Sequence, residues 1–317
     1  MLDFEIAPYL ELKDYKAPKG VKSYFVNMND GKKIRLIYWK KKTYSNDIRG
    51  TILLQQGHNE FVEKYYETIQ EFLDRNFNVV CFDWRGQGLS DRMINEHNKQ
   101  FIEDFDIHDN DLDYIINSII KVNFPKPLIG IGHSMGGCIL LSSLFLKQNN
   151  FDAMILSAPM LGFKNEKILM YLLPILNLFY NKKSFFPFSK PNMGDEIPFQ
   201  NNDLTKDELR YKRTQKLVKL NPKIRLWGIT ITWVNAVKKR LNLIRKESLN
   251  TKINIKLLIF NSINDRVVDS KKTNEIAKRL NNCNLINLFD IEHEIFMERD
   301  IHRKKMWDEI DKFLKNY

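Results

Sequence analysis

The segment Gly132–Gly136 reads Gly-His-Ser-Met-Gly and most constrains the fold, because it has the pattern G-x-S-x-G. It directly follows the apolar run Leu128–Ile131 and precedes a segment with helical spacing. A serine in such a strand-to-helix turn is strained, and glycines are needed around it because side chains would collide with neighbouring backbone. We therefore predict that Ser134 is a nucleophile projecting above a sheet, with the Met135 N–H at the helix N-terminus placed to hold an oxyanion.

The rest of the chain alternates between two apolar patterns. Short, mostly continuous apolar runs are typical of parallel strands buried on both faces, and they occupy Thr51–Gln56, Asn78–Trp84, Pro127–Gly132, Ala153–Ala158, Ile255–Phe260 and Asn284–Phe289. Between them, apolar residues recur at helical spacing in Val62–Arg75, Ile102–Lys121, Met135–Lys147, Ser270–Leu280 and Asp300–Leu314. This alternation predicts a mostly parallel, doubly wound α/β sheet.

Two segments depart from this alternation. The residues Lys22–Lys40 have alternating apolar positions on both sides of the turn sequence Asn29–Lys32, which predicts an N-terminal β-hairpin. From Leu161 to Leu249 the chain is rich in aromatic, Lys and Asn residues and only partly helical, so we interpret it as an insertion. The predicted organisation is a core in two parts, 1–160 and 250–317, with the insertion 161–249 between them.

A serine hydroxyl is a weak nucleophile at neutral pH and needs a base, which in a sheet of this kind follows the serine and an acid along the chain. Only two histidines follow Ser134. His293 comes just after the last predicted strand, whereas His302 lies within the C-terminal helix and is interpreted as solvated surface. We therefore predict His293 as the base. The earlier histidines are assigned to packing or to the surface.

The acid is expected in the loop after the strand Ile255–Phe260. Asp265 is the preferred candidate, since Asp269 has the position of a helix N-cap before Lys271. Asp290 is a third, weaker candidate. A carboxylate at Asp265 would orient the imidazole in the tautomer that accepts the serine proton.

A second oxyanion donor is expected from the loop after the strand Thr51–Gln56, and we assign it to the backbone N–H of His58. The pair His293-Glu294 lacks H-E-x-x-H spacing, and no glycine-rich phosphate loop follows the first strand. The chemistry predicted from these residues therefore requires neither a metal nor a cofactor.

The net charge of the chain indicates which partners are favoured electrostatically, but it does not indicate an activity. In 317 residues, 50 Lys and Arg stand against 39 Asp and Glu, a net charge of +11 that favours anionic partners such as a phospholipid surface. The charge is dispersed and no RNA- or DNA-binding motif appears, so nucleic acid is not an expected partner. Nothing in the sequence indicates an oligomeric state.

The cysteines and the N-terminus indicate a cytoplasmic protein. Cys81, Cys138 and Cys283 are odd in number and widely spaced, and the first two lie in apolar stretches, so buried thiols are expected and no disulfide framework. The segment Met1–Gly20 has acidic residues among its apolar ones and lacks the pattern of a signal peptide.

The apolar run Ile168–Tyr180 is too short to span a bilayer, which requires about 20 residues. Pro174 would kink it if it is helical, and Asn181-Lys182-Lys183 ends it. A helix packed against its own domain is the favoured interpretation. A helix that lies at a lipid interface, on the cytoplasmic side of a membrane, is the alternative.

Several motifs together resemble the α/β-hydrolases of the monoacylglycerol lipase and lysophospholipase group, and most of all the bacterial inner-membrane lysophospholipases. The resemblance covers nearly the whole chain, and its most specific parts are Asp83-Trp84-Arg85-Gly86-Gln87-Gly88-Leu89-Ser90 and Gly132–Gly137, with further matches at Gln56-Gly57, Glu60, Tyr65, Ser157–Met160, Arg210-Tyr211, Thr232-Trp233, Arg266–Asp269 and His293–Ile295. It implies that Ser134, Asp265 and His293 form a triad and that 161–249 is a lid. Glu60 and Arg85 are interpreted as structural ion pairs or loop scaffold.

One departure from that group falls in the oxyanion loop. Many members have His-Gly where this chain has Gln56-Gly57, and a small residue where it has His58. The resemblance therefore carries over least directly to the geometry of this loop.

The predicted reaction is hydrolysis of long-chain acyl esters through an acyl-enzyme, and the resemblance alone suggests a lysophospholipid as substrate. Apolar residues of the insertion are candidates to line an acyl groove, namely Leu169, Met170, Leu172, Leu173, Leu176, Phe179, Phe185, Phe186, Phe188, Trp227 and Trp233. A monoacylglycerol lipase, a thioesterase and a general carboxylesterase are alternatives with the same triad. A non-catalytic scaffold that binds lipid or a partner is an alternative of another class.

Overall fold

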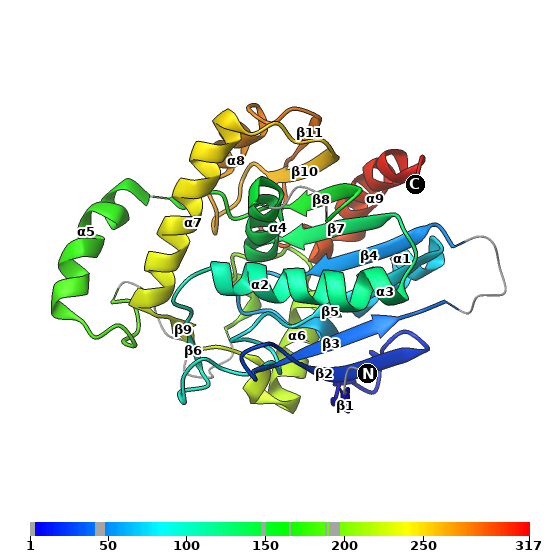
Figure 1. Cartoon of the computed structure of the whole chain (residues 1–317), viewed down its shortest axis with the longest axis horizontal. Helices are drawn as coiled ribbons and strands as arrows, with labels where there is room; N and C mark the ends of the chain where they lie inside the picture. The colour runs from blue at the N-terminus through cyan, green and yellow to red at the C-terminus, as the bar shows by residue number, and fades with distance from the viewer. Residues whose placement is uncertain (1–3, 42–47, 147–149, 165, 188, 190–196) are drawn as a thin grey trace.

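A sheet of nine strands forms the centre of the computed structural model, which describes residues 4–41, 48–146, 150–164, 166–187, 189 and 197–317 (Figure 1). The strands lie in the order β1-β2-β3-β5-β4-β7-β8-β10-β11. In chain order they are β1 (Glu5–Ile6), β2 (Val21–Asn27), β3 (Lys33–Trp39), β4 (Gly50–Gln55), β5 (Phe77–Phe82), β7 (Leu128–His133), β8 (Ala153–Ser157), β10 (Lys256–Ser262) and β11 (Cys283–Leu288).

The sheet is antiparallel at one side and parallel over the rest. β2 and β3 pair as the predicted hairpin, with Val21 opposite Trp39, and β3 pairs antiparallel with β5. From β5 through β4, β7, β8 and β10 to β11 each neighbouring pair is parallel. The predicted mostly parallel sheet with an N-terminal hairpin is therefore confirmed.

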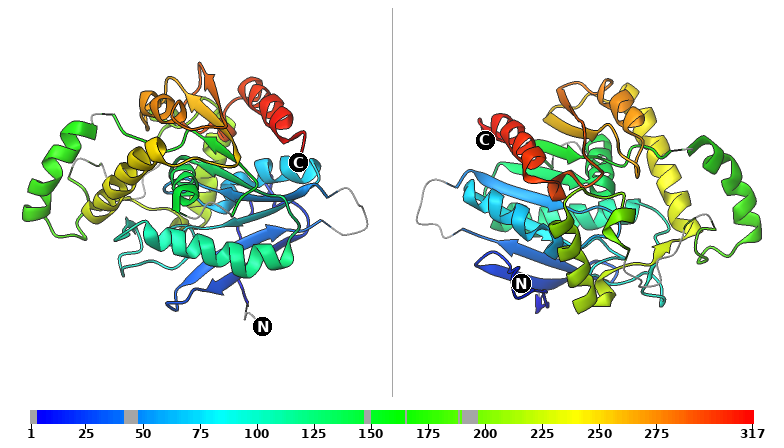
Figure 2. Two further views of the ribbon diagram at one scale, coloured as in Figure 1. Left: turned by 45° about the horizontal axis from the view of Figure 1, so that its top comes forward. Right: turned by 180° about the vertical axis from the view of Figure 1, so that it is seen from behind.

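Helices cover both faces of the sheet because successive side chains of its buried strands point to opposite faces. Val80 and Phe82 of β5 belong to one hydrophobic cluster, and Val79 and Cys81 belong to another. The first cluster includes side chains of the helices at the front of Figure 1. The second cluster includes side chains of the helices seen from behind in Figure 2. The front helices are α2 (Asp106–Ile115), α4 (Ser134–Leu146), α7 (Ile231–Asn250) and α8 (Ser270–Ala277), and the rear ones are α1 (Tyr66–Asp74), α6 (Glu208–Leu220) and α9 (Asp300–Leu314).

Some predicted elements differ in detail from those observed. The helix expected over Val62–Arg75 begins as a 3₁₀ turn, Val62–Tyr65, before α1. The helix expected over Ile102–Lys121 begins at Asp106 and continues through a π-helical turn, Ile116–Ile120, into the short α3 (Lys121–Asn123). The last strand, β11, was expected to be buried on both faces, but Asn284 and Asn287 are exposed. β11 lies at the edge of the sheet, where few elements cover it.

The chain leaves the sheet after β8 and returns at the neighbouring strand β10, with Met154 opposite Leu257. The residues between them form α5 (Glu166–Phe179), α6, α7, the short β9 (Gly228–Ile229), and the 3₁₀ turns Phe199–Asn201 and Pro222–Ile224. β9 pairs with β6 (Lys99–Gln100) in a separate small sheet. α7 packs on α4, and α5 packs on α7 at the outer side of the molecule (Figure 1).

α5 has apolar side chains on two faces, one buried and one exposed to solvent. Leu173 and Leu176 are buried, but the opposite face exposes Ile168, Tyr171, Ile175, Leu178 and Phe179, the last two by 79% and 75%. The favoured interpretation of a helix packed against its own domain thus holds for one face only. None of the described helices has both the length and the apolar character needed to cross a membrane.

Candidate active site

Ser134 lies in a strained turn between β7 and α4. Its φ is +49°, a left-handed conformation that is rare for a residue other than glycine, and its side chain is buried. The neighbouring glycines make this turn possible: a Cβ on Gly136 would lie 2.5 Å from the carbonyl oxygen of Gln56, and one on Gly132 would lie 2.7 Å from Cα of Gly137. The predicted reason for these glycines is therefore observed.

His293 lies between Ser134 and Asp265, in the loop that follows β11. Its Nε2 is 2.9 Å from Oγ of Ser134, and its Nδ1 is 2.7 Å from Oδ2 of Asp265. All three side chains are buried. The three residues follow β7, β10 and β11, so the carboxyl ends of parallel strands bring them to one edge of the sheet.

Asp265 is held as a carboxylate by its neighbours. Its Oδ1 accepts hydrogen bonds from the N–H groups of Val267 and Val268, at 2.7 and 2.9 Å. Burial raises the pKa of Asp265, but the hydrogen bond and charge of His293 and these two N–H groups outweigh it and hold the pKa below its ordinary value. An ionised Asp265 accepts the Nδ1–H of His293 and leaves Nε2 free to accept a proton from Ser134.

The other two acid candidates are engaged elsewhere. Asp269 is the N-cap of α8, and its Oδ1 accepts from the N–H groups of Lys271 and Lys272. Asp290 is exposed and pairs with Lys206 and Arg299. Neither forms a hydrogen bond with His293 among those of the described residues.

The loop after β4 is fixed by a buried ion network. Oε2 of Glu60 accepts from the Gly57 N–H at 2.6 Å and from the Tyr65 hydroxyl at 2.8 Å. Lys64 lies 2.5 Å from both Oε1 of Glu60 and Oε1 of Glu294, the residue after His293. The same network therefore anchors the His58 loop and the His293 loop.

The backbone N–H of His58 makes no hydrogen bond to any described residue, and the Met135 N–H lies in the first turn of α4, where intrahelical acceptors are absent. The His58 side chain is packed beside Trp233, with 4.9 Å between ring centroids. Burial lowers the pKa of His58 to about 4, so the ring is neutral near pH 7. The departure from the related pattern at this position is thus accommodated by packing against α7.

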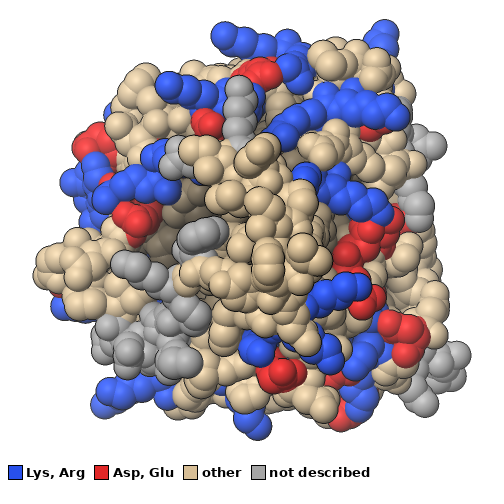
Figure 3. All heavy atoms as spheres, turned by 90° about the vertical axis from the view of Figure 1, so that its left-hand side faces the viewer, with Lys and Arg blue, Asp and Glu red and all other residues tan. Residues whose placement is uncertain are grey.

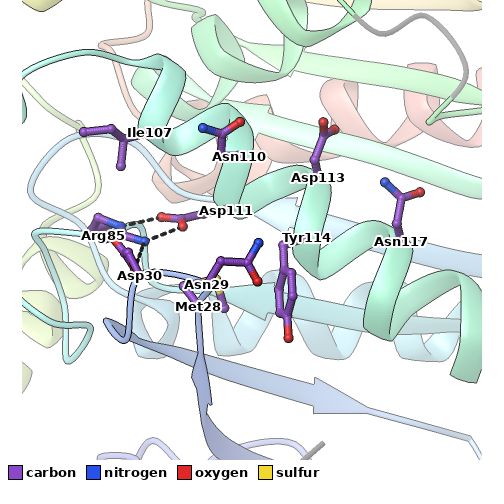
Figure 4. Close-up of a pocket in the computed structure, with 10 residues that line it drawn as sticks. All are labelled: Met28, Asn29, Asp30, Arg85, Ile107, Asn110, Asp111, Asp113, Tyr114 and Asn117. Atoms are coloured by element: carbon purple, nitrogen blue, oxygen red, sulfur yellow. Dashed lines mark hydrogen bonds and ion pairs between the residues drawn. The ribbon is translucent and has the colours of Figure 1, made fainter.

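Two further histidines and the ion pairs of Arg85 have structural positions. His133 is buried, with Nδ1 3.1 Å from the carbonyl oxygen of Ser157. His302 was expected on the solvated surface, and this is wrong: it is only 9% exposed, and its Nε2 lies 3.2 Å from Nη2 of Arg299. Arg85 lies between Asp30 and Asp111 at a second pocket of about 480 Å³, as Figure 4 shows. The interpretation of Glu60 and Arg85 as structural ion pairs is confirmed.

Ser134 opens into a cavity of about 220 Å³. The insertion contributes residues to it that were not predicted from the sequence, namely Leu204, Thr214, Gln215, Val218 and Arg225. None of the apolar residues predicted to line an acyl groove lines this cavity, among those that the structure describes. One of the predicted residues, Phe188, lies outside the described residues. No local motif marks Arg225 or Gln215, because they come together only through the packing of α6 beside the 3₁₀ turn Pro222–Ile224.

Comparison with known proteins places the chain in a family. The model of the family described as serine aminopeptidase, S33, matches residues 46–300. The chain belongs to this family. The probable lysophospholipase L2 of Haemophilus influenzae is 25% identical to this chain over 290 residues, which cover 89% of this chain and 88% of that protein. The monoglyceride lipase of Rattus norvegicus is 28% identical over 160 residues, 47% of this chain and 50% of that protein.

Solved structures agree with this S33 chain in fold. A soluble variant of monoglyceride lipase from Saccharomyces cerevisiae, in complex with a substrate analog, has a TM-score of 0.73 at 19% identity and covers 96% of this chain and 99% of that one. A carboxyl esterase from Bacillus coagulans has a TM-score of 0.74 at 15% identity, over 94% of this chain and 99% of that one. The predicted α/β-hydrolase fold, the family resemblance and the class of carboxylic ester hydrolase are confirmed.

The described residues contain no group of three or more His, Cys, Asp or Glu side chains arranged to hold a metal ion.

Proposed function

We propose that the protein hydrolyses the acyl ester of lysophospholipids through an acyl-enzyme on Ser134. The observation that carries this proposal is the hydrogen-bonded chain from Asp265 through His293 to the strained Ser134. A base within hydrogen-bond distance of a serine, itself oriented by a buried carboxylate, is the arrangement that activates a hydroxyl for attack on an ester.

In the first step, Oγ of Ser134 attacks the acyl carbonyl carbon while Nε2 of His293 takes the hydroxyl proton. The carbonyl oxygen becomes an oxyanion, held by the N–H groups of Met135 and His58. His293 then gives the proton to the glycerol oxygen, the ester bond breaks, and the acyl group remains on Ser134.

In the second step, a water molecule gives a proton to Nε2 of His293 and attacks the acyl-enzyme carbonyl. Collapse of the second oxyanion breaks the bond to Oγ of Ser134, which takes the proton back from His293. A fatty acid leaves and the free serine returns. A non-catalytic scaffold is disfavoured, because it would have no need for a strained serine hydrogen-bonded to a histidine.

The choice of lysophospholipid is supported by the relative named probable lysophospholipase L2, which aligns over most of both chains. A monoacylglycerol lipase is the second candidate, supported by relatives that bear that name. A general carboxylesterase or a thioesterase would use the same residues. We propose that residues 161–249 act as the lid over the site, since Leu204, Val218 and Arg225 close one side of the Ser134 cavity.

We further propose that the apolar face of α5 contacts an anionic membrane surface from its cytoplasmic side. Exposed apolar side chains recur along one face of the helix, and the exposed Lys182 and Lys183 follow the C-terminal end of the helix. On the side of the molecule where α5 lies, a central area with few charged atoms is bordered by Lys and Arg, with Asp and Glu among them (Figure 3). Cys81, Cys138 and Cys283 are free thiols, which suits a reducing compartment.

The test is release of fatty acid from 1-acyl lysophosphatidylethanolamine and from monoacylglycerol of the same chain length, with Ser134→Ala as control. We expect release from both, faster from the lysophospholipid, and none with Ser134→Ala. Faster release from monoacylglycerol would keep the mechanism and replace the substrate. Absence of release from either substrate would contradict the proposal.

A further inference from the structure

Arg225 is a half-buried cation in the Ser134 cavity. Its side chain lines the cavity, and its Nη1 donates to Oε1 of Gln215 at 3.3 Å. Among the described residues no carboxylate forms an ion pair with it. Of the described residues, the carboxylates that line the same cavity are Glu60 and Glu294, and both pair with Lys64.

The other arginines of the insertion show how unusual this is. Four of the five arginines in 161–249 pair with carboxylates: Arg210 with Glu67, Asp207 and Asp300, Arg213 with Glu67, Arg240 with Asp106 and Asp109, and Arg245 with Glu166. A guanidinium removed from water without an anion is unfavourable, and burial accordingly lowers the pKa of Arg225. An anionic ligand in the cavity would relieve this cost.

The backbone on both sides of Arg225 is fixed to the core. The Asn59 side chain, next to His58, accepts from the Leu226 N–H at 2.6 Å and donates to the Leu226 carbonyl oxygen at 3.0 Å. Arg92 donates to the carbonyl oxygen of Lys223 at 2.8 Å. The backbone that carries Arg225 is therefore held beside the loop that we propose for the oxyanion.

We propose that Arg225 binds the phosphate of the lysophospholipid head group and so selects phospholipid over neutral acylglycerol. This inference rests on the proposed function of the Ser134 site. In a 1-acyl lysophospholipid only the glycerol carbons and two ester oxygens separate the acyl carbonyl from phosphorus, and Ser134 and Arg225 line the same cavity. A planar guanidinium donates two parallel hydrogen bonds to a phosphate, whereas the hydroxyl of a monoacylglycerol offers no charge.

The experiment compares Arg225→Gln with the wild type on lysophosphatidylethanolamine and on monoacylglycerol of the same chain, each in micelles of a neutral detergent. We expect kcat/KM for the lysophospholipid to fall about ten- to a hundredfold, the value of a charge-assisted hydrogen bond, and kcat/KM for monoacylglycerol to change less than about threefold. Arg225→Lys should retain part of the preference. Arg279→Gln removes the same charge on the surface and should change neither substrate.

A second measurement reports binding without turnover of the lipid. Glycerophosphoethanolamine should inhibit hydrolysis of p-nitrophenyl butyrate by the wild type and inhibit Arg225→Gln about tenfold less strongly. An equal loss on both lipids, or equal inhibition of both proteins, would overturn the role of Arg225 while leaving the hydrolase intact. A wild type that releases fatty acid from neither lipid would instead contradict the proposed function.

Discussion

Asp265 and Asp269 both lie in the loop after β10, but of the two only Asp265 forms a hydrogen bond with His293 in the described structure. Asp265→Asn should lower kcat about a thousandfold or more, because an amide would donate to Nδ1 of His293 and leave the proton on Nε2, which could then no longer accept from Ser134. The measurement is kcat on p-nitrophenyl butyrate, together with the thermal midpoint to confirm folding.

Asp269→Asn is the matched control for that substitution. Asparagine caps a helix about as well as aspartate, so both turnover and stability should remain near those of the wild type. Full activity in Asp265→Asn together with loss of activity in Asp269→Asn would reverse our assignment of the acid.

At the scale of elements, the exposed face of α5 leads to a prediction about surfaces. The double change Leu178→Ser and Phe179→Ser should weaken binding to vesicles of phosphatidylethanolamine and phosphatidylglycerol about tenfold or more, because two side chains that are 79% and 75% exposed would no longer enter the lipid. Co-sedimentation with the vesicles measures this.

Hydrolysis of dispersed p-nitrophenyl butyrate should stay unchanged in the same α5 variant, since neither residue lines the described Ser134 cavity. Leu209→Ser, on α6, removes another exposed leucine and serves as control. Unaltered vesicle binding by the α5 variant would rule out this helix as the membrane contact.

The elements of the core could be predicted from sequence because their signals are local. The pattern around Ser134, the hairpin turn Asn29–Lys32 and the apolar runs each specify one element, and chain order then selects His293. The exposure of α5 and the burial of His302 could not be predicted, since the same apolar or polar spacing fits either environment until the neighbouring elements are placed. Arg225 was missed for the same reason.

At the scale of the whole molecule, Glu67 joins three helices. From α1 it pairs with Arg210 and Arg213 of α6 and with Arg303 of α9. Burial raises the pKa of Glu67, but these arginines outweigh it and bring the pKa to about 2. A carboxyl whose pKa is lower in the folded chain stabilises it above its ordinary pKa of 4.5 and loses that contribution as the pH falls toward 2.

Glu67→Gln should therefore lower the free energy of unfolding by about 2 kcal/mol near pH 7, and the gap from the wild type should narrow below about pH 4.5. Urea denaturation at several pH values measures both effects. Glu103→Gln, an exposed carboxylate, should change stability little at any pH. A gap for Glu67→Gln that stays constant from neutral to acidic pH would contradict this account.

The direct pairing of β8 with β10 separates two kinds of change that the chain can undergo. The proposed chemistry lies on loops of the sheet, at His58, Ser134, Asp265 and His293, whereas Arg225 comes from the segment that leaves and re-enters between two neighbouring strands. Because those strands pair directly with each other, the parts of that segment outside the packed faces of α6 and α7 can vary in length and sequence without a shift in the sheet. Selectivity can thus diverge among descendants of such a chain while the hydrolytic apparatus is inherited intact.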